Sequence, residues 1–367
     1  MTTGRRLAFI DHLRGFGVLI MIEAHVFDSW MRLPDRMLPL FSYARSLAGW
    51  AAPTFLFLAG LSLSMGMGRR LARGEEPAAV AWAGWRRGGW IFVLAIIFRL
   101  QSALTGATLR AILKVDILNV MGLAMLGAVA CWGLGRQRSH RVAVLLGAAA
   151  AVSLVTPLLR LAAWPGALPY FLDAYIRPIP GRTSFALFPW AGFVFAGAAA
   201  GLFIAPSGDG NGMSRVMTWF GGIGASAAAL GYGLSFLPSP YADSQFWTSS
   251  PAFFLLRCGI LLLALAVAYA LAPGLDGRAG SIGRVLTRLG TSSLFVYWVH
   301  VELVYGFISR PLQKHFSLGE TMAVYGLFVA LVYGLVVWRD AIMARWSGGR
   351  GRGAASESME PGRPVST

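Results

Sequence analysis

The chain has 367 residues, of which 56% are hydrophobic and 13% are charged, and its mean hydropathy is +0.61. Soluble globular domains carry about 25% charged residues, and apolar runs of about 20 residues recur here, so the composition excludes an ordinary soluble domain and predicts a multi-pass membrane protein. The two cysteines, Cys131 and Cys258, lie inside apolar runs, which argues against a disulfide framework and a zinc site, and we predict no metal.

The N-terminal sequence has the basic flank of a signal peptide, but Asp11, His12 and Arg14 interrupt its apolar region, so we predict that this segment is retained. A window of about 19 residues gives ten candidate spans, and we predict an all-α integral membrane protein with a bundle of about ten transmembrane helices. The spans are 12–30, 47–67, 88–105, 117–134, 142–161, 185–204, 217–237, 252–272, 289–309 and 321–340.

The distribution of basic residues predicts the orientation of the bundle. Of the 32 Lys and Arg residues, 19 lie on one side (counting Arg339 at the inner end of the last span with that side), 9 on the other, and 4 within spans. The positive-inside rule therefore places both termini in the cytoplasm, with the bacterial inner membrane as the expected location. The net charge of +16 is mostly this topology signal rather than a sign of nucleic-acid binding, although it also suits anionic lipid or a polyphosphate ligand. We predict a transmembrane domain over 1–346 and a disordered cytoplasmic tail over 347–367.

Two predicted outer loops, 164–184 and 238–251, mix aromatic residues with polar groups. This pattern favours an interfacial aromatic belt, with a ligand-binding platform as the alternative.

The first predicted helix carries a stripe of ionisable residues. At 100° per residue, Asp11, Arg14 and His25 fall within about 60° of one another, Asp28 lies near the same face, and Glu23 lies about 160° away. The rise from Arg14 to His25 is about 16 Å, about half of the hydrocarbon core. Because an ionisable group at this depth is costly, we interpret His25 as functional, the alternative being a packing histidine hydrogen-bonded to another helix. Asp11 and Arg14 alternatively form an interfacial ion pair.

A second constellation lies in "LGTSSLFVYWVHVELVYG", where Ser293 and Tyr297 share a helix face with His300. Catalysis and a helix–helix hydrogen bond are equally compatible with His300. The outer halves of the predicted spans contain further ionisable residues, namely Arg99, Arg160, Arg257 and Glu302. Each alone is typical of a snorkelling anchor, but together with the two histidines they suggest a polar cavity open to the outside.

At this point the chain resembles a known family. The segments "IDHLRGFGVLIMIEAHVFDSWM", "AAPTFLFLAGLSLSMG", "LKVDILNVMGLAML", "FALFPWAGFVFAGAAAG" and "LGTSSLFVYWVHVELVYG" together resemble bacterial membrane proteins grouped with the heparan-α-glucosaminide N-acetyltransferase catalytic domain, over about residues 7–340. The resemblance extends to the acyltransferase-3 proteins, which carry an Arg, ten residues and then a His in their first helix, the spacing of Arg14 and His25.

The resemblance implies a ten-helix enzyme that moves an acyl group, expected to be acetyl, from cytoplasmic acyl-CoA to a hydroxyl or amine of a glycan or similar acceptor at the outer face. Acyl-CoA would be a substrate, and no permanently bound cofactor is expected. His25 would be the catalytic histidine, with His300 as a second catalytic candidate and Asp28 orienting the imidazole of His25.

The donor would need cations for its phosphates at the cytoplasmic entrance. Arg14, supported by Asp11, and the loop residues Arg86 and Arg87 are the candidates, although the positive-inside signal alone also accounts for that loop.

Two alternatives remain open from the sequence. The same intramembrane groups suit a proton-coupled transporter or flippase, although the paired broken helices that this predicts are not evident. The second alternative is a non-catalytic membrane scaffold. The sequence does not indicate an oligomeric state.

Overall fold

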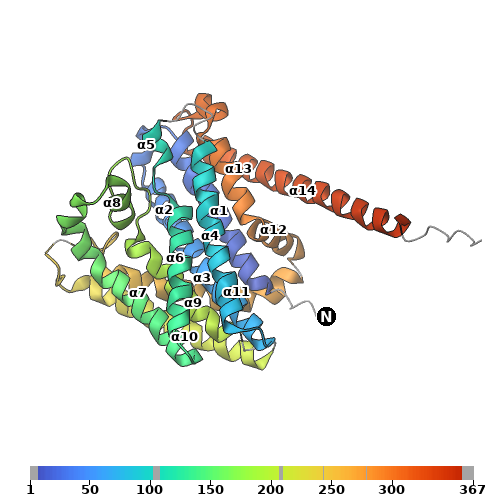
Figure 1. The fold of residues 1–367 in the computed structure, drawn as a ribbon. Coiled ribbons are helices and arrows are strands. Elements are labelled where there is room, and N and C mark those ends of the chain that lie inside the picture. Colours follow the sequence, from blue (N-terminus) through green and yellow to red (C-terminus); the bar gives the residue numbers. More distant parts are fainter. Residues whose placement is uncertain (1–6, 102–107, 206–209, 243, 278, 358–367) are drawn as a thin grey trace, which may run out of the picture.

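The computed structural model describes residues 7–101, 108–205, 210–242, 244–277 and 279–357. Across these residues the regular structure is helical, apart from two isolated β-bridges. The predicted all-α fold is therefore confirmed (Figure 1).

The longer helices are α1 (Ala8–Trp30), α3 (Ala51–Ala72), α4 (Pro77–Gln101), α6 (Ile117–Leu134), α7 (Arg138–Leu161), α9 (Leu187–Ile204), α10 (Asn211–Gly233), α11 (Pro251–Asp276) and α14 (Leu318–Glu357). The shorter elements connect or complete them: η1 (Pro34–Met37), α2 (Pro39–Ala48), α5 (Leu109–Ile112), η3 (Trp164–Ala167), α8 (Tyr170–Ile176), η4 (Leu234–Phe236), α12 (Gly280–Thr291), α13 (Ser293–Tyr305) and η5 (Phe307–Leu312).

Six helical segments of the described chain are long and apolar enough to cross a membrane: the run formed by α2 and α3, and α6, α7, α9, α11 and α14. Their burial differs in a way that suits a bilayer, since 72% of the apolar window of α9 is buried, against 22% for α11 and for α14. Apolar helices with mostly exposed faces are expected where lipid is the solvent. The protein is thus a multi-pass integral membrane protein, while four of the ten predicted spans stay predictions.

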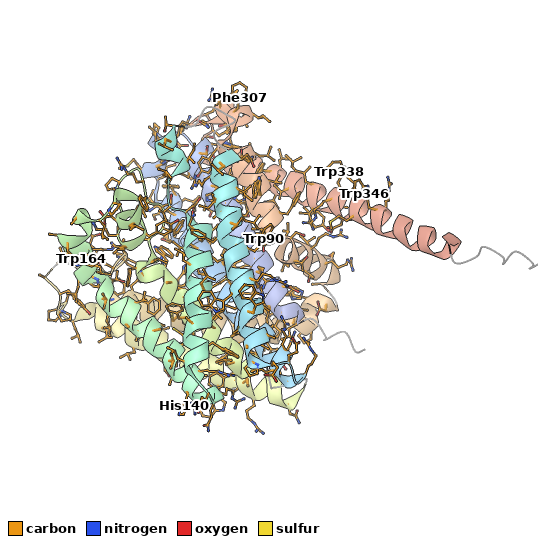
Figure 2. The ribbon with its side chains drawn as sticks, viewed as in Figure 1. Trp90, His140, Trp164, Phe307, Trp338 and Trp346 are labelled. Carbon is orange, nitrogen blue, oxygen red and sulfur yellow. The ribbon has the colours of Figure 1, made fainter. Side chains whose placement is uncertain are left out.

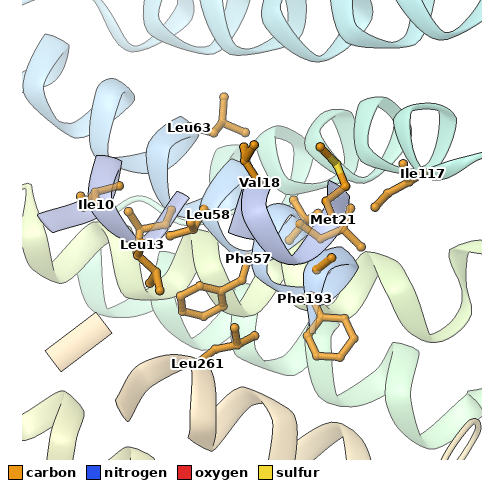
Figure 3. Packing of buried hydrophobic residues seen from close by; sticks show 14 of the residues in the cluster. Ile10, Leu13, Val18, Met21, Phe57, Leu58, Leu63, Ile117, Phe193 and Leu261 are labelled. Atoms are coloured by element: carbon orange, nitrogen blue, oxygen red, sulfur yellow. The ribbon is translucent and has the colours of Figure 1, made fainter. Parts of the chain in front are cut away.

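Part of the core forms around α3, which packs against both α1 and α9. Apolar side chains of α1, including Val18 and Met21, pack among Phe57 and Leu58 of α3 and Phe193 of α9 (Figure 3). These side chains are almost fully buried. This packing fixes the position of α1 and hence of its polar stripe.

A close contact between α1 and α12 holds the first turns of α1. A Cβ atom at Gly15 would lie 2.1 Å from the carbonyl oxygen of Leu286, and one at Gly290 would lie 2.1 Å from that of Asp11. Side chains cannot fit at such distances, so only glycine allows the two backbones to meet here. The contact lies next to Arg14.

The ninth predicted span differs from the structure. The span predicted over 289–309 is divided, because α12 ends at Thr291 and a new helix, α13, begins at Ser293. The junction sequence Gly290-Thr291-Ser292, the last two residues of α12 and the one that follows, has low helix propensity, which explains the break.

Helix α14 continues through Glu357 and extends away from the bundle, so it enters the predicted tail, and the domain boundary at 346 stays a prediction (Figure 1). Tryptophans on outward faces, such as Trp90 of α4 and Trp338 of α14, are exposed (Figure 2).

Candidate active site

A cavity of about 750 Å³ lies along α1, with walls from α3, α4, α6 and α13. It reaches from Arg14 to Asp28, which are fourteen residues apart, or about 21 Å at 1.5 Å per residue. His25 lines the same cavity. The predicted common face of Arg14 and His25 is therefore confirmed, and one cavity connects the two.

A direct contact between two histidines forms the centre of the site. Nδ1 of His25 lies 2.7 Å from Nε2 of His300, and the two ring planes are nearly parallel, at 10°, with centroids 4.9 Å apart. His300 is fully buried, while His25 faces the cavity. The two residues are separated by 275 positions, so the structure brings together two candidates that the sequence treated as independent.

The hydrogen bonds determine which ring nitrogen carries each proton. Nδ1 of His300 lies 2.7 Å from the carbonyl oxygen of Val296, which can only accept, so this Nδ1 is protonated. A neutral His300 then has a lone pair on Nε2 and accepts from Nδ1–H of His25. Burial disfavours charge on two imidazoles in contact. The remaining nitrogen of His25, Nε2, therefore holds a free lone pair.

The expected contact between Asp28 and His25 is not found. Within the described chain Asp28 accepts from the hydroxyl of Tyr305 at 2.9 Å and lies 3.8 Å from the guanidinium of Arg36. The nitrogen that Asp28 was expected to hold is occupied by His300. Asp28 still lines the cavity together with His25. In the structure His300, on another helix, takes the place beside His25 at which Asp28, three residues further along α1, was expected.

A second polar centre, which the sequence analysis missed, is Asp116. Its Oδ2 accepts from the guanidinium of Arg99 at 2.5 Å and from the hydroxyl of Tyr297 at 3.1 Å, and its Oδ1 accepts from the backbone of Ile117 at 2.7 Å. Asp116 is thus the N-cap of α6 and also the counter-ion of Arg99, both on the cavity wall. The Asp-x-x-Asn pattern ending at Asn119, just before an apolar run, was the available signal.

The end of the cavity near the start of α1 carries the predicted cations. Arg14 donates to Asp11 at 3.0 Å and to the hydroxyl of Ser62 at 2.8 Å. Arg87 also lines the cavity, and among the described residues it has no carboxylate partner. Arg86 does not line the cavity; it lines a surface hollow on α4, which Arg87 also borders. The structure therefore brings Arg14 and Arg87 together and leaves Arg86 outside.

The loop after α3 is partly neutralised by its own acid. Nε of Arg70 donates to Glu75 at 2.6 Å and Arg73 donates at 2.9 Å. These hydrogen bonds, that from Arg70 first, lower the pKa of Glu75, so the carboxylate stays charged. Arg70 and Arg73 are accordingly less suited than Arg87 to binding a mobile phosphate.

The other ionisable residues that we predicted in the outer halves of the spans do not all line the same cavity. Arg99 lines the main cavity, whereas Arg160 and Arg257 line a second pocket. Glu23 is buried with one oxygen lacking a hydrogen-bond partner, and it lies outside the cavity lining, as its helix angle predicted. Glu302 likewise lies outside that lining.

The fold and the site define a multi-pass membrane protein with two histidines in contact at an internal cavity, an arrangement suited to group transfer. Comparison with known families agrees. The family described as heparan-alpha-glucosaminide N-acetyltransferase, catalytic, matches residues 6–232, more than half of the chain, and the chain belongs to this family. It is therefore a membrane transferase of the acetyltransferase type. The comparison with curated proteins gave no match.

The matched range contains α1 and the polar residues of α4 and α6. His300 and Arg257 lie beyond it. The wider resemblance expected up to residue 340 thus stays a prediction for its last hundred residues.

Proposed function

We propose that the protein transfers an acyl group, acetyl in the simplest case, from cytoplasmic acyl-CoA to a hydroxyl or amine of a glycan at the outer face of the membrane. The observation that carries this proposal is the chain from the Val296 carbonyl through His300 to His25. It leaves a basic Nε2 on the residue that faces the cavity. The family match supports the transferase class.

In the proposed reaction, His25 Nε2 takes the proton from the acceptor hydroxyl or amine as the acceptor oxygen or nitrogen attacks the thioester carbonyl. The tetrahedral intermediate then collapses, the carbon–sulfur bond breaks, and the CoA thiolate recovers that proton from His25. The acyl group leaves on the acceptor, and the enzyme returns to its initial protonation state.

Two carboxylates would stabilise the imidazolium that forms during transfer. Asp116 and Asp28 line the same cavity as His25. Their effect is large where water is scarce, because the effective dielectric constant is low. The oxyanion of the tetrahedral intermediate would be stabilised by donors on the same wall, for which Arg99 and Tyr297 are the candidates.

The donor would enter from the end of the cavity that carries Arg14 and Arg87. A guanidinium binds phosphate oxygens in a fork, and two such groups beside one opening suit the diphosphate of CoA. The pantetheine arm would then lie along α1 and bring the thioester to His25, eleven residues or about 16 Å further along the helix.

The test is acyl-CoA turnover by purified protein in nanodiscs, with glucosamine as the acceptor. His25→Ala is expected to lower kcat by about 10²–10⁴-fold, the contribution of a general base. His140→Ala is the matched control, because His140 is exposed at the start of α7, outside the cavity lining (Figure 2). Equal turnover in both variants would remove His25 from catalysis.

The transporter alternative is tested in the same preparation. If the cavity served transport, sugar flux into sealed liposomes would proceed without acyl-CoA and without acyl transfer. The proposal requires that acceptor modification depend on acyl-CoA.

A further inference from the structure

Two helices that line the reaction cavity do not pack closely against each other. The cavity lining includes residues of α4 on one side and of α12 and α13 on the other, and in Figure 1 α1 is visible between α4 and α12. In the described chain α4 packs along α6 and against α3, and neither α12 nor α13 is among its close neighbours. We call the space between Ile91 of α4 and Leu294 of α13, which both line the cavity, the lateral seam.

Aromatic contacts close the lateral seam at the level of the histidine pair. The ring centroid of Phe98 lies 5.6 Å from that of Tyr297 and 5.1 Å from that of Trp298. Nε1 of Trp298 donates to Oε1 of Gln101 at 2.8 Å. Ile91 is seven residues before Phe98, and Leu294 is four before Trp298, so they lie about 10 Å and about 6 Å from this closure along their helices. The lateral seam is therefore on the Arg14 side of the closure.

The protein surface beside the lateral seam is apolar. Trp90 and Val93, which flank Ile91 on α4, are 59% and 44% exposed, and Leu294 is 38% exposed (Figure 2). Ile91 lies near the middle of α4. Because the protein spans a membrane, apolar side chains exposed at this position face hydrocarbon rather than water. The lateral seam therefore joins the cavity to a lipid-facing surface.

The middle of the cavity suits hydrocarbon as well. Its lining between the polar ends includes Met21, Phe55, Ile91, Met121, Leu294 and Val301. Methionine side chains are unbranched and adapt to ligands of different shape. The volume of about 750 Å³ lies in the upper part of the range for small-molecule sites, so the cavity is not restricted to a donor as small as an acetyl thioester.

The proposed reaction leaves one direction for the acyl chain. The pantetheine arm approaches His25 along α1 from Arg14, and the acceptor approaches from the opposite end, near Asp28. The rest of the acyl group, attached to the same carbonyl carbon, must therefore extend sideways. Leu294 is six residues before His300, or about 9 Å along α13. With C–C bonds of about 1.5 Å, an extended chain advances about 1.3 Å per carbon, so about seven carbons cover this distance.

We propose that the cavity accepts acyl-CoA donors with chains of about eight carbons or more, and that the chain leaves through the lateral seam between Ile91 and Leu294 into the bilayer. This inference rests on the proposed function and adds a class of donor to acetyl-CoA. The chemistry is unchanged. The thioester carbon–sulfur bond breaks, a bond forms from the acyl carbon to the acceptor oxygen or nitrogen, and His25 carries the acceptor proton to the CoA thiolate.

The test compares acetyl-, hexanoyl- and decanoyl-CoA as donors to glucosamine, with the full chain in phosphatidylcholine nanodiscs. For the wild-type protein, kcat/KM with decanoyl-CoA is expected to be within about 10-fold of that with acetyl-CoA. A closed acetyl pocket would instead discriminate by about 10-fold or more against each added methylene. Each variant is described by its decanoyl-to-acetyl ratio, because partition of decanoyl-CoA into the lipid is then the same for all variants.

Leu294→Trp places a large ring in the lateral seam and is expected to lower the decanoyl-to-acetyl ratio by at least about 10-fold, since overpacking excludes the chain. The hexanoyl-to-acetyl ratio should change by about 2-fold or less, because six carbons end before Leu294. Val93→Trp is the matched control, with the same new side chain on an exposed residue outside the cavity lining, and should keep both ratios. Ile91→Trp blocks the seam from α4 and replaces Leu294→Trp if that variant folds poorly.

A second measurement locates the chain without relying on turnover. A decanoyl-CoA analogue with a diazirine at the end of its chain is cross-linked to the wild-type protein, and the sites are mapped by mass spectrometry. Cross-links are expected on α4 and α13 beside Ile91 and Leu294, and excess CoA should suppress them. Cross-links that persist with excess CoA, or that fall only on other helices, would show that the chain merely dissolves in the lipid and would overturn the proposal.

The outcomes separate this inference from the proposed function. Transfer of acetyl but not decanoyl groups, or equal ratios in Leu294→Trp and Val93→Trp, would overturn the exit of the chain through the lateral seam and leave His25-dependent acetyl transfer intact. Absence of transfer with every donor, together with CoA-sensitive cross-links at the seam, would contradict the proposed function and retain the chain-binding site.

Discussion

The replacement His300→Ala tests whether the buried histidine acts through His25. The variant removes the acceptor 2.7 Å from Nδ1 of His25 and leaves the cavity-facing ring in place. Without this acceptor, the proton of His25 can move to Nε2, which is the nitrogen that must be free. The imidazolium formed during transfer also loses a partner for its Nδ1–H.

The size of the effect follows from that hydrogen bond. A hydrogen bond to a charged group contributes about 1.5–3 kcal/mol, and it is fully made when His25 is protonated. At about 1.4 kcal/mol for each factor of ten, kcat should fall by about 10- to 150-fold. The KM for acyl-CoA should stay nearly constant, because the phosphates are expected to bind near Arg14 and Arg87, far from His300.

A double-mutant cycle makes the assay decisive. Single-turnover rates are measured for His25→Ala, His300→Ala and the double variant, each checked for folding by size-exclusion chromatography and circular dichroism. Residues that act as a unit are strongly non-additive, so His300→Ala should have little further effect when His25 is absent. A full additional loss in that background would refute the positioning role.

Two further predictions concern the donor end of the cavity and its support. Arg87→Gln should raise the KM for acyl-CoA by about 10-fold with a small effect on kcat, because it removes a charge-assisted contact to phosphate. Arg86→Gln is the control and should leave KM unchanged, because Arg86 lies outside the cavity lining. Equal effects of the two replacements on KM would contradict the assignment. Gly290→Ala should destabilise the protein by about 1–3 kcal/mol in thermal or denaturant unfolding, because the new Cβ would lie 2.1 Å from the carbonyl oxygen of Asp11. Gly66→Ala is the control: its Cβ would meet nothing within 4 Å, so this replacement should be neutral or slightly stabilising.

The sequence predicted those features that depend on local periodicity. Apolar runs marked helices such as α6 and α9 closely, and the 100° rotation per residue placed Arg14 and His25 on one face, where the structure has a single cavity. Depth in the membrane then made His25 a candidate. These inferences depend only on the geometry of one helix and its depth in the membrane, and not on contacts with distant segments.

The parts that the sequence did not predict depend on contacts between distant segments. The partner of His25 is 275 residues away, and helix geometry instead suggested Asp28, the acid nearest along the same face. Asp116 was overlooked because an N-cap is common and its pairing with Arg99 and Tyr297 needs three helices to meet. The break between α12 and α13 was missed because an apolar window averages over its polar residues.

The most direct test of the central claim is the sidedness of transfer. Proteoliposomes with uniformly oriented protein receive labelled acetyl-CoA on the side of Arg14, while glucosamine is enclosed with the opposite side. The account predicts labelled acetylglucosamine on the acceptor side for the wild-type protein and the loss of that label in His25→Ala. Label that forms only when donor and acceptor share one side, or that persists without His25, would contradict a cavity that joins the two faces through this histidine.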